Sequence, residues 1–296
     1  MNSSSSFYDE TLDLPLQQDV ARALAEDLGT GDLTASLVPA DAWARAYVMT
    51  REPAVLCGAP WVLAASRAID PSMVLTWQVA EGQACIANQR VLDVQGPARS
   101  VLSLERTALN FLQMLSAVAT KTAHYVAAAQ GTRARIVDTR KTLPGLRLAQ
   151  KYAVRVGGGL NHRIGLFDAV LIKENHIAAA GGIGPVLRRA REAAARATFV
   201  EIEVETLDQL REALHEGAEM ILLDNMDLDT LHQAVAINEQ WSRETGRRPA
   251  VLEISGGVTL GSIRALALTG VDRISVGALT KDIQAIDFSM RFEPLH

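Results

Sequence analysis

The 296-residue chain contains only two cysteines, Cys57 and Cys85, and no long uninterrupted apolar run. Two cysteines cannot build a disulfide framework, and their spacing fits no common zinc-binding motif, so a reducing cytoplasm is the expected compartment. No apolar stretch approaches the roughly 18 residues that a membrane-spanning helix needs, so we expect no membrane partner. Residues 1–10 hold a serine run without a basic start or an apolar stretch. They are expected to form a frayed tail rather than a signal peptide.

Motifs of several enzyme classes are also missing. The chain contains neither the GxGxxG fingerprint of dinucleotide-binding folds nor a P-loop, and it contains no GxSxG nucleophile elbow. Apolar residues make up 48% of the chain and charged residues 21%, which excludes a disordered or collagen-like protein. The length fits one large domain or two modest domains, and no internal repeat of fixed period is present.

Charge is distributed unevenly along this acidic chain. The formal net charge is −5, but residues 133–173 carry nine Lys or Arg against Asp138 and Asp168, a local charge of +7. The remaining residues therefore sum to −12. Such an island indicates a local anion site, although composition alone would also allow a solvated basic surface. Duplex nucleic acid would need a broad basic face, so we expect no nucleic-acid partner.

The first third of the chain mixes helical and strand patterns. Residues 14–28 have helical spacing, and residues 44–51, 73–79 and 91–95 are typical of strands separated by turns. A long helical pattern over residues 98–130 follows, with apolar residues stepping by threes and fours. We expect this helix to end one domain and begin the next.

From residue 133 onward, short apolar runs alternate with helical patterns, which predicts parallel strands buried on both faces. The expected strands are 135–137, 169–172, 199–204, 220–223, 251–254 and 274–276, with helices that include 183–197, 207–216 and 260–269. Such units could form an open doubly wound sheet or a barrel. Nearly every run ends in a charged or glycine-rich group, and barrel active sites lie at the carboxyl ends of the strands. We therefore favour a barrel, complete or incomplete.

Four polar residues of the basic island are candidates for binding anions. Arg140 and Lys141 are adjacent cations that a loop could turn toward one anion, with surface solvation as the simpler alternative. His162 and Arg163 follow three glycines at 157–159, whose missing side chains let a ligand approach the backbone. A guanidinium binds a planar carboxylate through two hydrogen bonds. His162 by itself would more often be a satisfied core histidine.

Three charged residues end neighbouring strands of the expected barrel. Lys173 would pair with Glu203 or Asp224 across the mouth, would touch substrate, or would do both. The two carboxylates suit a divalent cation bound through oxygen, or positive charge that develops on a sugar. No His or Cys cluster accompanies them, which disfavours zinc and iron. Glu201 and Glu205 share the alternation face of Glu203, so spacing alone does not choose among the three.

Glycine-rich turns follow the last two strands. Residues 255–257 and 276–278 are placed to lead into helix N-termini and to present backbone N–H groups to a phosphate. This late position is a frequent phosphate site in barrels. The residues together predict an anion-rich pair of substrates, at least one of them phosphorylated.

The motifs, taken in order, resemble the quinolinate phosphoribosyltransferase family, also called nicotinate-nucleotide pyrophosphorylase (carboxylating), from about Leu14 to the C-terminus. They are ERTALN at 105–110, DTRKTLPG at 138–145, GGGLNHR at 157–163, LIKENH at 171–176, EIEVE at 201–205, ILLDN at 221–225, SGG at 255–257 and VGALT at 276–280. The resemblance implies an N-terminal open α/β sandwich, residues 1–117 together with the tail 282–296, and an incomplete TIM-like α/β barrel, residues 118–281. It also implies a homodimer that converts quinolinate and phosphoribosyl pyrophosphate to nicotinate mononucleotide, pyrophosphate and carbon dioxide with Mg²⁺, a step of NAD synthesis.

The resemblance also assigns roles to particular residues. Lys141, Lys173, Glu203 and Asp224 would be catalytic, and Glu203 and Asp224 would meet the ribose hydroxyls and the metal, directly or through water. The quinolinate carboxylates and the pyrophosphate would be held by Arg140, His162, Arg163 and Lys173, with Lys141 nearby, and Thr139 would also bind substrate. Arg106 would reach the site of the partner subunit. The 5-phosphate would be held by Ser255, Gly256, Gly257, Val276, Gly277 and Ala278.

Three other functions remain open on the sequence. One is a paralogue of the same fold associated with molybdenum uptake, and another is a non-catalytic sensor of pyridine nucleotides. Retention of Glu203 and Asp224 disfavours a sensor. A generic phosphate-binding barrel enzyme, such as an aldolase, would need Lys173 to form a Schiff base.

Overall fold

The computed structural model describes residues 10–293, so the expected frayed tail lies almost entirely outside the described residues. The chain divides into two compact units. The first unit comprises Met1–Ala123, Thr142–Gly158 and Leu279–His296, and the second comprises His124–Lys141 and Gly159–Ala278. This division assigns residues 142–158 to the first unit, whereas the expected boundary at 117/118 assigns them to the barrel. The domain boundaries expected from the sequence stay a prediction.

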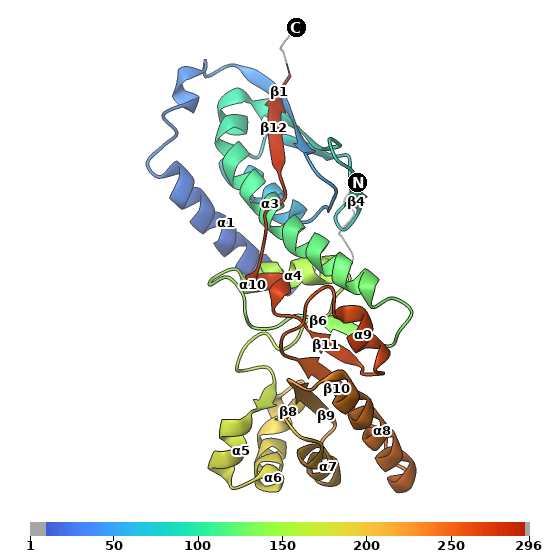
Figure 1. Ribbon diagram of the computed structural model, residues 1–296. Helices are drawn as coiled ribbons and strands as arrows, with labels where there is room; N and C mark the ends of the chain where they lie inside the picture. The colour runs from blue at the N-terminus through green and yellow to red at the C-terminus, as the bar shows by residue number, and fades with distance from the viewer. Residues whose placement is uncertain (1–9, 294–296) are drawn as a thin grey trace. The chain divides into compact units, whose positions relative to one another are not determined.

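The first unit contains an antiparallel sheet. Its strand order is β12 (Phe288–Phe292), β1 (Trp43–Thr50), β5 (Arg90–Pro97) and β3 (Val74–Trp77), and a two-stranded sheet pairs β2 (Ala54–Val55) with β4 (Ala84–Cys85). Buried residues alternate along β1, as expected for a strand with one face on the core. In Figure 1, the red strand β12 lies beside the blue strand β1, so the two ends of the chain join one sheet.

Four helices belong to this unit in whole or in part: α1 (Asp13–Leu28), α2 (Ala59–Ile69), α3 (Ala98–Ala128) and α4 (Arg147–Val156). Helix α1 buries Leu16 and Val20 and ends at Gly29, whose φ of +51° suits a residue without a side chain. The predicted helices at 14–28 and 98–130 and the predicted strands at 44–51, 73–79 and 91–95 are confirmed to within a few residues.

The second unit contains a six-stranded parallel sheet. Its strands are β6 (Arg135–Val137), β7 (Val170–Ile172), β8 (Val200–Val204), β9 (Met220–Asp224), β10 (Val251–Ser255) and β11 (Arg273–Ser275), in the order β6-β11-β10-β9-β8-β7. Strands β7 to β11 therefore neighbour one another in chain order, and β6, the first strand, pairs with β11, the last. Within residues 10–293 the arc is not closed by pairing between β6 and β7. A parallel bridge joins Leu160 to Val137 at this open seam. The unit is an incomplete α/β barrel, as predicted.

The second unit also holds the helices that connect these strands. They are α5 (Glu174–Ala180), α6 (Ile183–Ala193), α7 (Leu207–His215), α8 (Leu228–Thr245) and α9 (Ile263–Leu268). Short helical turns complete the chain: η1 (Glu10–Leu12), η2 (Ala35–Leu37), η3 (Ala194–Arg196) and α10 (Ala278–Lys281). Figure 1 shows β8 to β11 side by side, with α6, α7 and α8 gathered on one side of them. In the described part of the chain, no helix combines the length and the apolar character needed to cross a membrane.

The strands of the barrel are buried on both faces, as the continuous apolar runs predict. On β8, Ile202 and Val204 face one side and are fully buried, and Glu201 and Glu203 face the other side. The same alternation places Glu253 on the inner face of β10. The interior of this barrel is therefore partly ionic, and its charged residues need partners.

Candidate active site

The candidate site residues of the second unit lie at the carboxyl ends of the six strands, an edge that we call the rim. Because the strands are parallel, all of these ends meet at one edge of the sheet. The rim carries Thr139, Arg140 and Lys141 after β6, Lys173 after β7, Glu203 on β8, Asp224 on β9, Ser255 at the end of β10, and Val276, Gly277 and Ala278 after β11.

Two arginines form a positive cluster on the rim. Arg163 is partly buried, and burial together with the positive charge of Arg140 lowers the pKa of its guanidinium. The carboxylates of Asp168 and Glu201 act in the opposite direction and raise this pKa. Two adjacent guanidinium groups offer two bidentate sites for planar carboxylates. This geometry is suited to a ligand that carries two carboxylates.

A second cluster combines cations with carboxylates. Lys173 Nζ lies 2.6 Å from Glu203 Oε2, which is one of the two pairings predicted for this lysine. The Lys173 side chain is 48% exposed and that of Glu203 is 11% exposed, so the pair stands at the open end of the barrel. Burial and the negative charge of Glu203 raise the pKa of Asp224, whereas the charges of Lys173 and Lys141 lower it.

The two carboxylates of this cluster fit a divalent cation. Glu203 and Asp224 are close enough for the charge of one to disfavour ionisation of the other, which is a repulsion that a bound cation would relieve. Their donor atoms are oxygens, which Mg²⁺ prefers. The donor set therefore fits the metal that the resemblance implies.

Gly277 packs against the loop that follows β6. A Cβ at this position would lie 3.1 Å from Lys141 Cδ and 3.5 Å from Thr139 Oγ1. The Lys141 N–H donates to Thr139 Oγ1 at 3.1 Å, which fixes the turn. Lys141 therefore lies over the Gly277 backbone, while the charge of Arg140 acts on Arg163. That these two adjacent cations bind an anion stays a prediction.

The glycine turn after β10 is shaped by backbone conformations that a side chain would strain. Gly256 and Gly257 have φ of +97° and +58°, and the neighbouring Asn225 has φ of +55°. A Cβ on Gly256 would lie 2.7 Å from Asn225 Oδ1. Helix α9 follows this turn and begins at Ile263, whereas the sequence predicted a helix from residue 260. The turn lies at the rim, directly after the carboxyl end of β10.

His162 is buried, with 7% of its surface exposed, and both of its ring nitrogens have protein partners. Nδ1 accepts the Arg163 N–H at 2.8 Å, and Nε2 lies 2.8 Å from Glu201 Oε2. The sequence had left open whether this histidine is a ligand contact or a satisfied core residue. The geometry describes a satisfied core residue next to the arginine cluster.

Beneath the rim lies a buried ionic network that the sequence did not predict. Glu201 and Glu253 are fully buried, and burial raises the pKa of each carboxyl group to about 7. Arg273 Nε lies 2.8 Å from Glu253 Oε2, and Ser275 Oγ donates to Glu253 Oε1. A carboxylate in the middle of an apolar strand was the available signal, because such a group needs a partner in the interior.

Arg106 lies outside the second unit. It is an exposed residue of α3 in the first unit, and its predicted role at the site of a partner subunit stays a prediction.

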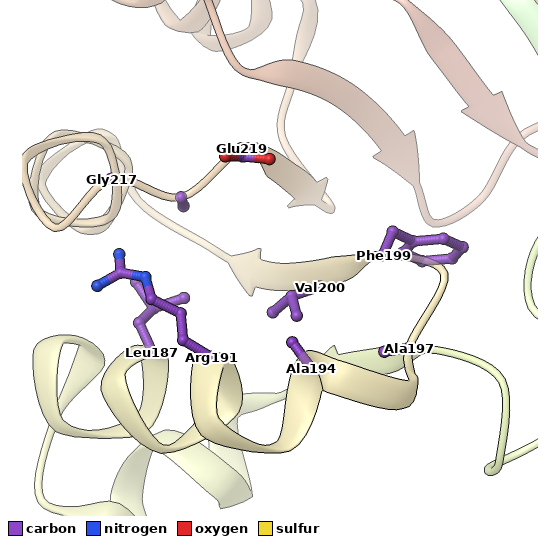
Figure 2. Close-up of a pocket in the computed structure, with 9 residues that line it drawn as sticks. Leu187, Arg191, Ala194, Ala197, Phe199, Val200, Gly217 and Glu219 are labelled. Atoms are coloured by element: carbon purple, nitrogen blue, oxygen red, sulfur yellow. The ribbon is translucent and has the colours of Figure 1, made fainter.

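A cavity of about 310 Å³ opens at the opposite end of the barrel strands (Figure 2). Leu187 and Arg191 of α6, Val200 at the start of β8, and residues 217–219 before β9 line it. None of the predicted site residues belongs to its lining. The chemistry of the chain is concentrated at the rim and not in this cavity.

An incomplete α/β barrel whose rim combines paired guanidinium groups, a carboxylate pair and glycine turns defines a barrel enzyme for anionic, phosphorylated substrates. The model of the quinolinate phosphoribosyl transferase N-terminal domain matches residues 32–116, and the model of the C-terminal domain matches residues 118–291. The chain belongs to the quinolinate phosphoribosyltransferase family.

Individual relatives match the chain over nearly its whole length. It is 45% identical to the nicotinate-nucleotide pyrophosphorylase [carboxylating] of Mycobacterium leprae, over 92% of this chain and 95% of that protein. It is 38% identical to the probable enzyme of the same name from Bacillus subtilis, over 94% and 93% of the two chains. The nicotinate-nucleotide pyrophosphorylase structure from Francisella tularensis superposes with a TM-score of 0.90 at 43% identity, covering 98% of this chain and all of that one.

Proposed function

We propose that this chain transfers a phosphoribosyl group from phosphoribosyl pyrophosphate (PRPP) to quinolinate with loss of carbon dioxide. The products are nicotinate mononucleotide, pyrophosphate and carbon dioxide, and the reaction brings quinolinate into NAD synthesis. The observation that carries the proposal is the rim, where the Arg140–Arg163 cluster accompanies the carboxylates of Glu203 and Asp224. The first cluster suits a dicarboxylate, and the second suits an activated sugar.

Quinolinate would be held by the arginine cluster. Its two neighbouring carboxylates match two guanidinium groups, and each charge-assisted hydrogen bond contributes about 1.5–3 kcal/mol. Lys173 adds a third cation on the side of Glu203. Binding orients the pyridine nitrogen toward the sugar, which is the main task in a reaction without a protein nucleophile.

PRPP would lie across the glycine turns and the carboxylate pair. Gly256, Gly257 and Gly277 would present backbone to the 5-phosphate, and Lys141 lies against Gly277 on the same part of the rim. Glu203 and Asp224 stabilise the positive charge that develops at the anomeric carbon as pyrophosphate departs.

The bond changes follow from this arrangement. The bond from the anomeric carbon to pyrophosphate breaks, and the electron pair of the pyridine nitrogen forms the new bond to that carbon. The quaternised ring then accepts the electron pair released when the adjacent carboxylate leaves as carbon dioxide, and the ring carbon takes up a proton. The chain's residues bind, orient and neutralise, in keeping with a sequence that shows no nucleophile motif.

Mg²⁺ is the metal we propose for this reaction. Glu203 and Asp224 would hold it, directly or through water, and a bound Mg²⁺ would neutralise charge on the leaving pyrophosphate.

We further propose a homodimer in which Arg106 serves the neighbouring site. Its exposed position on α3 supports a role outside its own unit. The proposed compartment is the cytoplasm, and the buried, unpaired thiols of Cys57 and Cys85 suit reducing conditions there.

The deciding experiment incubates the purified protein with quinolinate, PRPP and Mg²⁺ and measures nicotinate mononucleotide together with carbon dioxide released from the carboxylate next to the ring nitrogen. Both products should form in equal amounts and only when all three reactants are present. Binding of quinolinate without turnover would contradict the proposal and favour a sensor. If the protein consumes PRPP with a different acceptor but not with quinolinate, the result would favour a paralogous transferase.

A further inference from the structure

The segment that carries Arg163 belongs to no helix or strand. Residues 161–163 form an irregular connection between the Leu160 bridge and the loop that precedes β7. Such a segment lacks the regular hydrogen-bond ladder that fixes backbone position in helices and sheets. The direction of the Arg163 guanidinium is therefore set by contacts of this segment with its surroundings, together with the hydrogen bond that the guanidinium itself donates to the Ala169 carbonyl oxygen at 3.5 Å.

One side of the segment is anchored to the end of β6. The fully buried Asp138 accepts the His162 N–H through Oδ1 at 2.8 Å and the Asn161 side-chain amide through Oδ2 at 2.6 Å. These bonds fix the amino end of the segment and leave the peptide of Arg163 to be held by other groups.

The other anchor passes through the imidazole of His162. Because Nδ1 accepts the Arg163 N–H, this nitrogen bears a lone pair and the ring proton is on Nε2. Nε2–H then donates to Glu201 Oε2 at 2.8 Å, with Glu253 Oε1 at 3.5 Å. The ring of Phe199 meets the imidazole edge-on at 5.2 Å. The imidazole thus links a site peptide to carboxylates inside the barrel.

One of the two inner carboxylates, that of Glu253, is itself held by the next strand. Glu253 is opposite Arg273 in the β10–β11 register, and Arg273 Nε lies 2.8 Å from Glu253 Oε2. Ser275, two residues further on the same face of β11, donates to Glu253 Oε1. Three strands of the barrel therefore contribute to the support of one irregular segment.

We propose that Glu201 and Glu253 are positioning residues for the dicarboxylate substrate: acting through His162, they fix the peptide that carries Arg163 and touch no substrate atom themselves. The substrate named in this proposal rests on the proposed function. The contacts themselves do not: Glu201 and Glu253 each face Nε2 of His162, and Arg273 pairs with Glu253.

The same cluster satisfies a loose geometric criterion for a metal site, since ligand atoms of His162, Glu201 and Glu253 lie within 4.8 Å of one another. Two features favour the positioning role instead. The Arg273 guanidinium already supplies a cation to Glu253, and the Nε2 proton already occupies the gap between His162 and Glu201. A metal would have to displace both.

The kinetic test compares Glu201→Ala, Glu201→Gln and the control Glu205→Ala. Glu205 lies on the same face of the chain beyond β8 and is exposed. We expect Glu201→Ala to raise the KM for quinolinate about tenfold while the KM for PRPP stays within about twofold. Glu201→Gln, whose amide oxygen still accepts Nε2–H, should restore most of the quinolinate KM, and the control should match the wild type.

A second readout does not depend on activity. Nitrogen NMR of the ligand-free wild type should show His162 with a lone pair on Nδ1 and a slowly exchanging proton on Nε2, and Glu201→Ala should lose the slow exchange. If Glu201→Ala does not fold, Ser275→Ala takes its place because it removes the hydrogen bond that holds Glu253, with the same selective rise in quinolinate KM expected. A wild type without quinolinate turnover would remove the proposed function and leave the NMR result to decide on the contacts.

Three results would overturn the inference. One is a proton on Nδ1 in the wild type. Another is a well-folded Glu201→Ala variant whose KM values for quinolinate and PRPP are unchanged or rise together. The third is one equivalent of metal bound in the purified protein and lost in Glu201→Ala.

Discussion

Glu201 and Glu203 lie two residues apart on β8 and face the same side of the sheet, yet they have different partners. Glu203 stands at the rim and pairs with Lys173 at 2.6 Å, whereas Glu201 is fully buried and accepts the Nε2 proton of His162. The rise along the strand places one carboxylate where substrate arrives and the other about 7 Å deeper. Position along one strand therefore separates two chemically identical side chains into different roles.

Asp224→Asn should lower kcat about 100-fold, because the neutral amide neither stabilises positive charge on the ribose nor attracts a divalent cation as a carboxylate does. The variant should also need more Mg²⁺ for half-maximal rate. The matched control is Asp227→Asn, an exposed N-cap of α8 that accepts the Thr230 N–H at 2.8 Å. Asparagine caps helices as well as aspartate, so this variant should keep wild-type kinetics. Steady-state rates at several Mg²⁺ concentrations distinguish the two variants. An Asp224→Asn variant with an unchanged kcat would show that Asp224 is not part of the active site.

Arg163→Ala should raise the KM for quinolinate about 10- to 150-fold, the range that corresponds to the loss of one charge-assisted carboxylate contact. The KM for PRPP should change little, because the cluster with Arg140 is separate from the glycine turns. Arg247→Ala removes an exposed arginine far along the chain and serves as the control. Equal effects of the two substitutions would show that Arg163 does not bind the substrate.

Gly277→Ala should raise the KM for PRPP without a large loss of stability. The new methyl group would lie 3.1 Å from Lys141 Cδ and would push this flexible side chain away from the phosphate position. Gly277 does not have a positive φ, so alanine causes no backbone strain there. Gly261→Ala is the control, since its added methyl would meet no atom within 4 Å and its φ is not positive either. Thermal unfolding together with PRPP titrations distinguishes a displaced lysine from a damaged fold.

The strands of the barrel could be predicted from sequence because each is a short apolar run that ends in polar groups. Helix α8 was missed, although Asp227 and Gly246 mark its two ends as an N-cap and a C-cap with φ of +68°. Strand β12 could not be found in this way, because its pairing of Met290 with Val48 joins residues at opposite ends of the chain. A strand that pairs with a distant part of the chain leaves no local signal of its partner, and its own five residues are too few to identify it.

Rim residues were similarly easier to predict than their partners. Lys173 follows from the end of its strand, and its pairing with Glu203 was one of two that the sequence predicted. The choice of Glu203 over Glu201 and Glu205 came from the family resemblance and not from spacing. The partnership of Glu253 with Arg273 depends on the register of two strands 20 residues apart, which the sequence pattern does not specify. The role of His162 depends in turn on which carboxylate lies behind it. Buried networks are therefore the part of this site that needed three-dimensional structure.

Stability should fall as pH rises through neutrality, in part because of Glu253. Burial and the charge of Glu201 raise the pKa of Glu253 from 4.5 to about 7, so the folded chain holds this proton more tightly than the unfolded chain. The corresponding stability is complete below about pH 4.5 and is lost as pH rises through about 7. Glu253→Gln cannot ionise and should lose about 2 kcal/mol less between pH 5 and pH 8 than the wild type. Urea unfolding at both pH values measures the difference, with Glu205→Gln as the control, and parallel pH slopes would contradict the assignment.

The proposed dimer makes a quantitative prediction for mixed subunits. Arg106→Ala and Asp224→Ala should each be inactive alone, because every site of either homodimer lacks one essential group. In a mixed dimer, the subunit that keeps Asp224 receives an intact Arg106 from its partner, so one of its two sites is complete. Random reassortment makes about half of the dimers mixed and should restore about a quarter of wild-type activity.

If Arg106 instead served its own subunit, both sites of the mixed dimer would stay defective. Absence of recovery, after mass-tagged subunits have been seen to exchange, would therefore place Arg106 outside the neighbouring site.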